Sequence, residues 1–438
     1  MKRKCETVAA RKKDRRRKRL RRIWKTVCVF LMVLGVLFVC DRIFLLDVPV
    51  EENNDLGAEE KSENINNTDI EVSQTELEDE TTKLMKNAEQ ILDDMTLEER
   101  VFQMFIVTQE QLTGVSPVTQ SGETSKLAIE KYPVGGIVYF AANLVSREQC
   151  TTMIQNIQSY SKIGLFIAVD EEGGKVARLG NQSEMGTTAF PPMGSIGNSE
   201  DTSKAYEVGY VIGKEISELG FNLDFAPVAD VYSNIENTVI GDRAFSNDPQ
   251  IAAEMVSACV LGFRDSGMLC TLKHFPGHGD TTTDSHYGAA TITKSLEELY
   301  ECELIPFQAG IDAGAPFVMV GHLTALQITE EDVPVTLSHD LVTGLLREQM
   351  GFQDIIITDS MSMQAITDYY SAGDAAVKAV QAGVDMILMP QNLQESVNGI
   401  LSAVENGVIT EERINESVLR ILQVKISQGI IEIENQEM

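Results

Sequence analysis

Apolar and β-branched residues gather in eight short runs along residues 82–438. The runs are continuous rather than alternating with polar residues, which is typical of strands buried on both faces of a parallel sheet. They are Val101–Val107, Gly136–Phe140, Leu165–Asp170, Asn222–Pro227, Leu269–His274, Phe317–His322, Asp354–Asp359 and Asp385–Met389.

Stretches with an apolar face at helical spacing lie between these runs, and two of them begin with capping-box spacing, at Thr96–Glu99 and Ser146–Gln149. The longest predicted helices are Asp201–Leu219, Asp248–Asp265, Ser295–Asp312, Ser338–Met350 and Gly373–Ala382. Eight strand–helix repeats predict an α/β fold of the (β/α)8 TIM-barrel type. A doubly wound sheet is the alternative, but no G-x-G-x-x-G follows the first predicted strand.

The first 81 residues differ in composition from the rest. Residues 1–25 hold 14 Lys or Arg and 2 Asp or Glu, and residues 26–46 are apolar apart from Asp41 and Arg42. We expect a basic cytoplasmic tail, then a membrane anchor or signal segment at 26–46, with the remainder outside the cell or secreted. Residues 47–81 hold 13 Asp or Glu, one Lys and no aromatic residue, which predicts a disordered linker. The folded domain is then 82–438.

The charge of the chain excludes one class of partner. It has 36 Lys and Arg against 66 Asp and Glu, a net charge of −30, and residues 26–438 hold only 22 of the basic residues. A body this acidic repels phosphates, so no nucleic acid partner is expected. Cys150, Cys259, Cys270 and Cys302 form no CxxC pair, which predicts small buried residues rather than disulfides. We expect a monomer.

Chemically capable side chains stand at the carboxyl ends of five predicted strands, where barrel enzymes build their sites. They are Asp170, Asp224 or Asp230, Lys273 with His274, His322, and Asp359. Three stretches contain most of them: DEEGGKVAR at 170–178, KHFPGHGD at 273–280 followed by DSH at 284–286, and ITDSM at 357–361.

These stretches resemble the β-N-acetylglucosaminidases of glycoside hydrolase family 3, and the resemblance runs from about residue 85 to 428. It implies that Asp359 is the nucleophile and that Asp284 and His286 form an acid–base dyad. It also implies that the sugar is bound by Asp170, Arg178, Lys273 and His274, together with Arg243 of the IGDRAF string. The chain departs from the family at Glu171, Lys175 and Ser360, which puts fine substrate preference in doubt.

The resemblance implies retaining hydrolysis of terminal N-acetyl-β-D-glucosaminides of cell-wall or chitin type. A retaining enzyme needs a carboxylate at the anomeric carbon and a proton donor at the leaving oxygen. An imidazole with an ordinary pKa of about 6.5 both donates and accepts protons near neutral pH. No metal or organic cofactor is therefore expected, while phosphate in place of water as the acceptor stays open.

Two alternatives belong to other functional classes. A metal-dependent barrel hydrolase would use His274, His278 and His286 as ligands. Against it, no histidine occurs before residue 274, so the His-x-His pair on the first strand is missing. A non-catalytic sugar-binding surface protein would not need Asp359 or the dyad, and the chain has both.

Overall fold

All eight predicted strands are present, each shorter than its apolar run. The computed structural model describes residues 81–281, 290–329 and 333–433. Its strands are β1 (Phe105–Val107), β2 (Gly136–Val138), β3 (Phe166–Val169), β6 (Leu223–Asp224), β7 (Thr271–Phe275), β9 (Phe317–Val320), β11 (Ile355–Thr358) and β12 (Ile387–Leu388). The start of the first prediction is wrong: residues 101–103 belong to helix α3 (Leu97–Gln103), because the Thr96 capping box begins a helix that runs through them.

The strands pair in parallel in two sheets, in the orders β12-β1-β2-β3-β6 and β11-β9-β7. Isolated parallel bridges join Leu223 to Leu269 and Ile357 to Met386, at the two places where the sheets adjoin. Contacts divide the whole chain into two units, 1–69 and 70–438, and the described residues lie in the second. The fold of this unit is α/β with parallel strands, as predicted.

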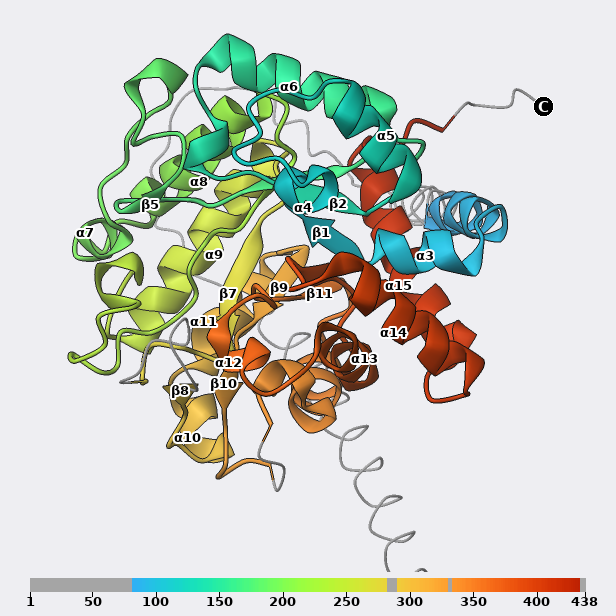
Figure 1. The fold of residues 1–438 in the computed structure, drawn as a ribbon. Helices are drawn as coiled ribbons and strands as arrows, with labels where there is room; N and C mark the ends of the chain where they lie inside the picture. The colour runs from blue at the N-terminus through green and yellow to red at the C-terminus, as the bar shows by residue number, and fades with distance from the viewer. Residues whose placement is uncertain (1–80, 282–289, 330–332, 434–438) are drawn as a thin grey trace, which may run out of the picture. The chain divides into compact units, whose positions relative to one another are not determined.

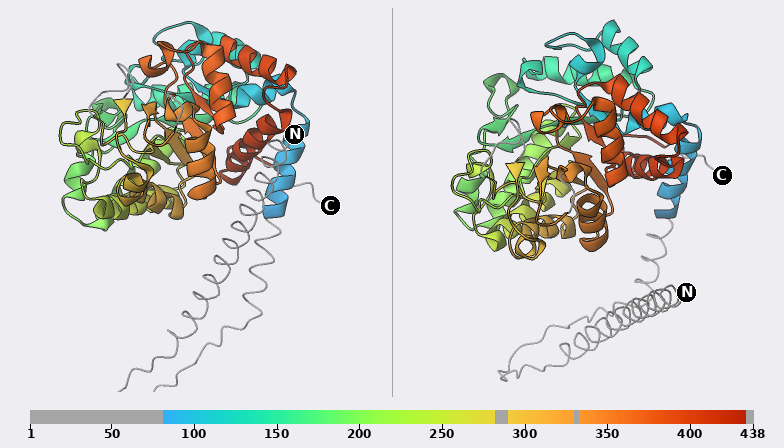
Figure 2. Two further views of the ribbon diagram at one scale, coloured as in Figure 1. Left: turned by 90° about the horizontal axis from the view of Figure 1, so that it is seen from below. Right: turned by 60° about the horizontal axis from the view of Figure 1, so that its bottom comes forward.

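Helices surround these strands (Figures 1 and 2). Besides α3 and a helix at residues 81–93, they are α4 (Gln109–Thr113), α5 (Glu123–Lys131), α6 (Arg147–Tyr160), α7 (Met193–Gly197), α8 (Thr202–Ser217), α9 (Pro249–Asp265), α10 (Leu296–Glu301), α11 (Leu304–Asp312), α12 (Gln364–Thr367), α13 (Ala372–Ala382), α14 (Leu393–Glu405) and α15 (Glu411–Ser427). The predicted helix Ser295–Asp312 is two helices, since the backbone turns at Cys302. The segment Asp340–Gln349 is a π-helix.

Two small strand pairs extend the carboxyl ends of the main strands. The antiparallel pair β4 (Glu171–Gly173) and β5 (Val176–Ala177) follows β3, and the parallel pair β8 (Ala290–Thr291) and β10 (Leu323–Thr324) follows β7 and β9. Parallel strands present their carboxyl ends at one edge, so these pairs and the strand-end residues lie on the same side of the core.

Three of the four predicted buried cysteines are buried, Cys302 is half-buried, and all four are free thiols. The predicted tail (1–25), the predicted anchor (26–46) and the predicted linker (47–81) lie outside the described residues, except Thr81, which belongs to the helix at residues 81–93. Among the helices that the structure describes, none combines the length and the apolar character that a membrane span requires.

Candidate active site

A cavity of about 490 Å³ opens at the carboxyl ends of the strands. It contains every predicted sugar-binding residue and the predicted nucleophile, which reach it from elements far apart in the sequence. Its charged and imidazole-bearing lining residues are Asp170, Glu172, Arg178, Arg243, Lys273, His274, His278 and Asp359. The structure therefore brings described residues from each of the three motif stretches together.

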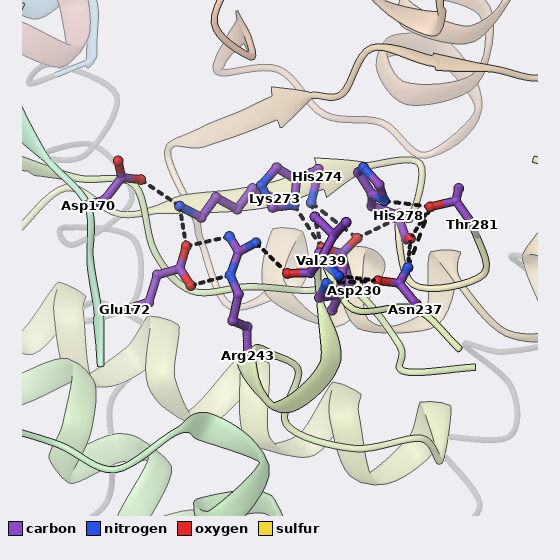
Figure 3. Close-up of polar contacts among 11 residues, drawn as sticks. Asp170, Glu172, Asp230, Asn237, Val239, Arg243, Lys273, His274, His278 and Thr281 are labelled. Atoms are coloured by element: carbon purple, nitrogen blue, oxygen red, sulfur yellow. Dashed lines mark hydrogen bonds and ion pairs between the residues drawn. The ribbon is translucent and has the colours of Figure 1, made fainter. Parts of the chain in front are cut away.

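Alternating charges form a continuous chain among the residues that line this cavity, and Figure 3 shows Asp170, Lys273, Glu172 and Arg243 of this chain. Lys273 Nζ donates to Asp170 Oδ1 over 2.7 Å and lies 2.6 Å from Glu172 Oε1. Arg243 binds Glu172 with two nearly parallel hydrogen bonds, Nε to Oε2 at 2.8 Å and Nη2 to Oε1 at 2.7 Å. Arg178 Nη2 completes the chain on Asp170 Oδ2 at 3.3 Å. We call these five residues the charge network.

Two members of the charge network, Lys273 and Glu172, keep their charges although they are buried. The side chains of Lys273 and Glu172 are each only 2% exposed. Burial alone would raise the pKa of Glu172, but the charges of Arg243 and Lys273 outweigh it and hold that pKa well below its ordinary value. Burial likewise opposes the charge of Lys273, and Asp170 and Glu172 outweigh it, so its pKa is raised. Each ion is fixed by neighbours of opposite sign.

Asp359 lies directly after β11, at the position that the sequence predicts for the nucleophile. Its backbone N–H donates to Val320 O over 2.9 Å, and its Oδ1 accepts from Ser360 N–H over 2.7 Å. His322 lies after β9 and contacts Ser360 O through Nε2 at 2.9 Å. Residues at the end of β9 thus contact the backbone at Asp359 itself and at the following residue, Ser360.

Asp230 organises the histidines of the second motif. It is 1% exposed, its Oδ2 contacts His274 Nδ1 at 2.8 Å, and its Oδ1 accepts from His278 N–H over 2.6 Å (Figure 3). Burial alone would raise the pKa of Asp230, but His274 and His278 together lower it. Thr281 Oγ1 lies 2.7 Å from His278 Nδ1. His274 faces the cavity from a fixed orientation, and His278 braces the following turn.

The predicted dyad, Asp284 and His286, lies outside the described residues, which end at Thr281 and resume at Ala290. The ligand set predicted for a metal hydrolase, His274, His278 and His286, is therefore only partly described. Within the described residues, no group of three or more His, Cys, Asp or Glu side chains could hold a metal ion.

Glu172 is the member of the charge network that the sequence analysis missed. It follows Asp170 by two residues, and side chains two apart on an extended strand point to the same face. That spacing was available in the DEEGG string, whereas its partner Arg243 is 71 residues away.

Comparisons with known proteins agree on one family. The model of the glycosyl hydrolase family 3 N terminal domain matches residues 96–424. The Beta-hexosaminidase A of Pseudoalteromonas piscicida is 33% identical over 69% of this chain, which spans 55% of that relative's length. The Beta-hexosaminidase of Nitrosomonas eutropha is 32% identical over 69% of this chain and 88% of its own. A solved glycoside hydrolase family 3 beta-N-acetylglucosaminidase from Paenibacillus sp. str. FPU-7 is 34% identical with a TM-score of 0.72, covering 78% of this chain and 65% of its own.

Proposed function

Because the chain belongs to glycosyl hydrolase family 3 and is by family a glycoside hydrolase, we propose that it is a retaining β-N-acetylglucosaminidase. It removes terminal non-reducing N-acetyl-β-D-glucosaminyl residues from cell-wall or chitin-type oligosaccharides. The two hexosaminidase relatives and the solved acetylglucosaminidase support this choice of sugar.

One observation carries the proposal: the charge network and Asp359 line the same cavity. Glu172 and Val239 O accept three of the five N–H donors of Arg243, and Asp170 and Glu172 accept two of the three on Lys273. Among the described residues no acceptor engages the remaining donors. Such pre-oriented donors suit the hydroxyl groups of a sugar, and Asp170, Arg178, Arg243, Lys273 and His274 hold it in our proposal.

The proposed reaction has two displacements at C1, with Asp359 on one face of the sugar ring and His286 at the leaving oxygen on the other. The Asp359 carboxylate attacks C1 while the C1–O bond breaks, and His286 gives its proton to the leaving oxygen. Water then attacks C1, His286 takes the proton from that water, and the bond to Asp359 breaks. Asp284 orients the imidazole and stabilises its charged form. The roles of Asp284 and His286 rest on the sequence motif, and the position of Asp359 in the cavity supports its role.

The assay compares nitrophenyl N-acetyl-β-glucosaminide with nitrophenyl β-glucoside, each with and without phosphate. We expect turnover of the first substrate, with free N-acetylglucosamine as product in both buffers. A sugar 1-phosphate would show phosphorolysis instead. Activity should survive EDTA, and a loss that zinc restores would favour the metal hydrolase.

Asp359→Ala should lose nearly all activity, because it removes the group that forms the glycosyl–enzyme bond. Asp368→Ala, at the exposed end of α12, is the matched control and should behave like the wild type. If Asp359→Ala keeps more than about a tenth of wild-type turnover, Asp359 is not the nucleophile.

The architecture that we propose is one closed (β/α)8 barrel within the domain 82–438. The bridges Leu223–Leu269 and Ile357–Met386 support it. One joins the edge strand β6 to the segment at β7, and the other joins the edge strand β11 to the segment at β12, so the two sheets are connected at both edges. We further propose that residues 26–46 anchor or export the barrel through the linker 47–81, and that it acts as a monomer. Protease added to intact cells should digest the barrel, and full protection would contradict export.

A further inference from the structure

An ion pair between a buried carboxylate, Glu303, and a half-buried amine, Lys294, lies beside the turn that follows β7. Glu303, directly before α11, is 0% exposed, and Lys294 Nζ donates to its Oε1. Ser233 Oγ donates to the same oxygen over 3.0 Å, and Lys294 Nζ lies 3.6 Å from Asp280 Oδ1. Burial alone would lower the pKa of Lys294, but Glu303 and Asp280 raise it, so the amine is charged. None of these residues belongs to the charge network.

Lys294 connects the two chain segments between which residues 282–289 run. The segment that leaves β7 is fixed from one side: Asn237 Nδ2 donates to His278 O over 2.7 Å, and Asn234 N–H donates to Gly279 O over 3.2 Å. The returning segment is fixed by β8 and by Ile292 N–H, which donates to Thr324 O over 2.8 Å. Asp280 belongs to the first segment and Lys294 to the second.

Glu303 also packs directly on the turn between β7 and the first segment. Gly277 in that turn has φ +128°, and a Cβ built on it would lie 2.6 Å from Glu303 Cγ. The turn therefore accepts only glycine while Glu303 occupies this place. Glu303 contacts the turn through its carbon atoms and the returning segment through its carboxylate.

We propose that Lys294 and Glu303 are positioning residues that set where the segment carrying Asp284 and His286 begins and ends. This inference rests on the proposed function, in which those two residues transfer the proton. A buried ion pair contributes little net stability compared with apolar side chains of the same size. Its charge-assisted hydrogen bonds are directional, however, and so it fixes geometry.

The effect of losing the pair should depend on the leaving group. Proton transfer is worth about 10²–10⁴-fold, and a displacement of about 1 Å can cost 10²-fold. A disaccharide needs a proton on its leaving oxygen, whereas a nitrophenolate departs with little protonation. Displacement of the acid–base group therefore lowers kcat/KM for the disaccharide much more than for the nitrophenyl substrate.

The experiment uses the full chain with Lys294→Met and Glu303→Gln, each assayed on N,N′-diacetylchitobiose and on nitrophenyl N-acetyl-β-glucosaminide. We expect kcat/KM to fall about 10-fold or more for chitobiose and less than about 3-fold for the nitrophenyl substrate, a partial loss of proton transfer. Azide, which needs no base, should raise the nitrophenyl turnover of both variants. Lys294→Arg should restore the wild-type ratio of the two substrates. Lys204→Met, from an exposed pair with Asp201 at 3.8 Å, is the matched control.

A wild-type substrate ratio in both Lys294→Met and Glu303→Gln overturns the proposal. So does an equal loss on both substrates in a variant whose circular dichroism spectrum is native. If one variant fails to fold, the other decides. His286→Ala in the same assay tests the proposed dyad separately from the positioning role of Lys294 and Glu303. If His286→Ala discriminates between the substrates and the pair variants do not, only the positioning role is wrong. If His286→Ala does not discriminate, the proposed dyad is wrong and the positioning role falls with it.

Discussion

Glu172→Gln removes the one carboxylate that Arg243 and Lys273 share. In the wild type, three contacts of 2.6–2.8 Å reach the two oxygens of Glu172. A glutamine has one oxygen and one NH₂ group, so at least one cation must face a donor. The substitution keeps the size of the side chain and changes only its charge and hydrogen bonding.

The magnitude follows from what each cation retains. Removing one partner of a buried ion pair costs about 3–5 kcal/mol. Lys273 keeps Asp170 at 2.7 Å, and Arg243 keeps Val239 O at 3.1 Å, which places the cost near the lower end of that range. We therefore expect the free energy of unfolding to fall by about 3 kcal/mol. If transition-state stabilisation falls by the same amount of about 3 kcal/mol, kcat/KM falls about 100-fold, because each factor of ten corresponds to about 1.4 kcal/mol.

Urea unfolding and kcat/KM on nitrophenyl N-acetyl-β-glucosaminide measure the two effects. Asp242→Asn is the matched control, because Asp242 adjoins Arg243 in sequence but pairs with Lys175 at 3.8 Å, with both side chains more than half exposed. Such a surface pair is worth about 1 kcal/mol or less. If Glu172→Gln is as stable and as active as Asp242→Asn, the charge network does not hold the site together.

The pH dependence gives a second check. The pKa of Glu172 is lower in the folded protein than in the unfolded chain, so its contribution to stability is fully present above the unfolded value and is lost in acid. The stability gap between wild type and Glu172→Gln should therefore be constant from neutral pH down to about pH 5 and narrow below it. A gap that widens on acidification would contradict the reasoning.

Three further variants test other parts of the fold. Asp385→Asn should lower the free energy of unfolding, measured in urea, by about 3–5 kcal/mol, because Asp385 is 0% exposed and contacts Arg347 at 2.5 Å and Arg420 at 3.1 Å. The activity of the folded fraction should not change, since Asp385 precedes β12 at the end opposite the cavity. Burial lowers the pKa of Lys425 to about 7, so the free energy of unfolding of the wild type should rise as pH increases from about 7 to 10. Lys425→Met should be more stable than the wild type in urea at about pH 7, and this difference should shrink towards about pH 10. A difference that stays constant over that range would mean that Lys425 does not titrate there. Gly277→Ala should lower the melting temperature of the protein by more than Gly407→Ala does. Both glycines have positive φ, but a Cβ at Gly277 would meet Glu303, whereas nothing lies within 4 Å of a Cβ at Gly407. Equal melting temperatures of the two variants would contradict the contact with Glu303.

The strands were predictable from the sequence because they are buried on both faces and read as continuous apolar runs. The errors occur where two patterns overlap. Val101 and Phe102 are apolar and fit either period, and the capping box at Thr96 begins a helix that includes both. The break at Cys302 has a signal in the sequence that the prediction did not use: Pro306 would clash with the carbonyl of residue 302 in a continuous helix, and it lies instead in the first turn of α11.

The site shows the same division between local pattern and distant partner. Motif residues at strand ends were identifiable singly, and the parallel topology brings Asp170, Lys273 and Asp359 to one cavity as expected. What the sequence does not contain is the pairing. Glu172 is a candidate surface charge until Arg243 binds it across 71 residues, and Glu303 is one more acidic residue in an acidic chain until Lys294 and Gly277 enclose it. In both cases burial turns an ordinary carboxylate into a residue that fixes the positions of its neighbours, and burial depends on the whole fold rather than on the local sequence.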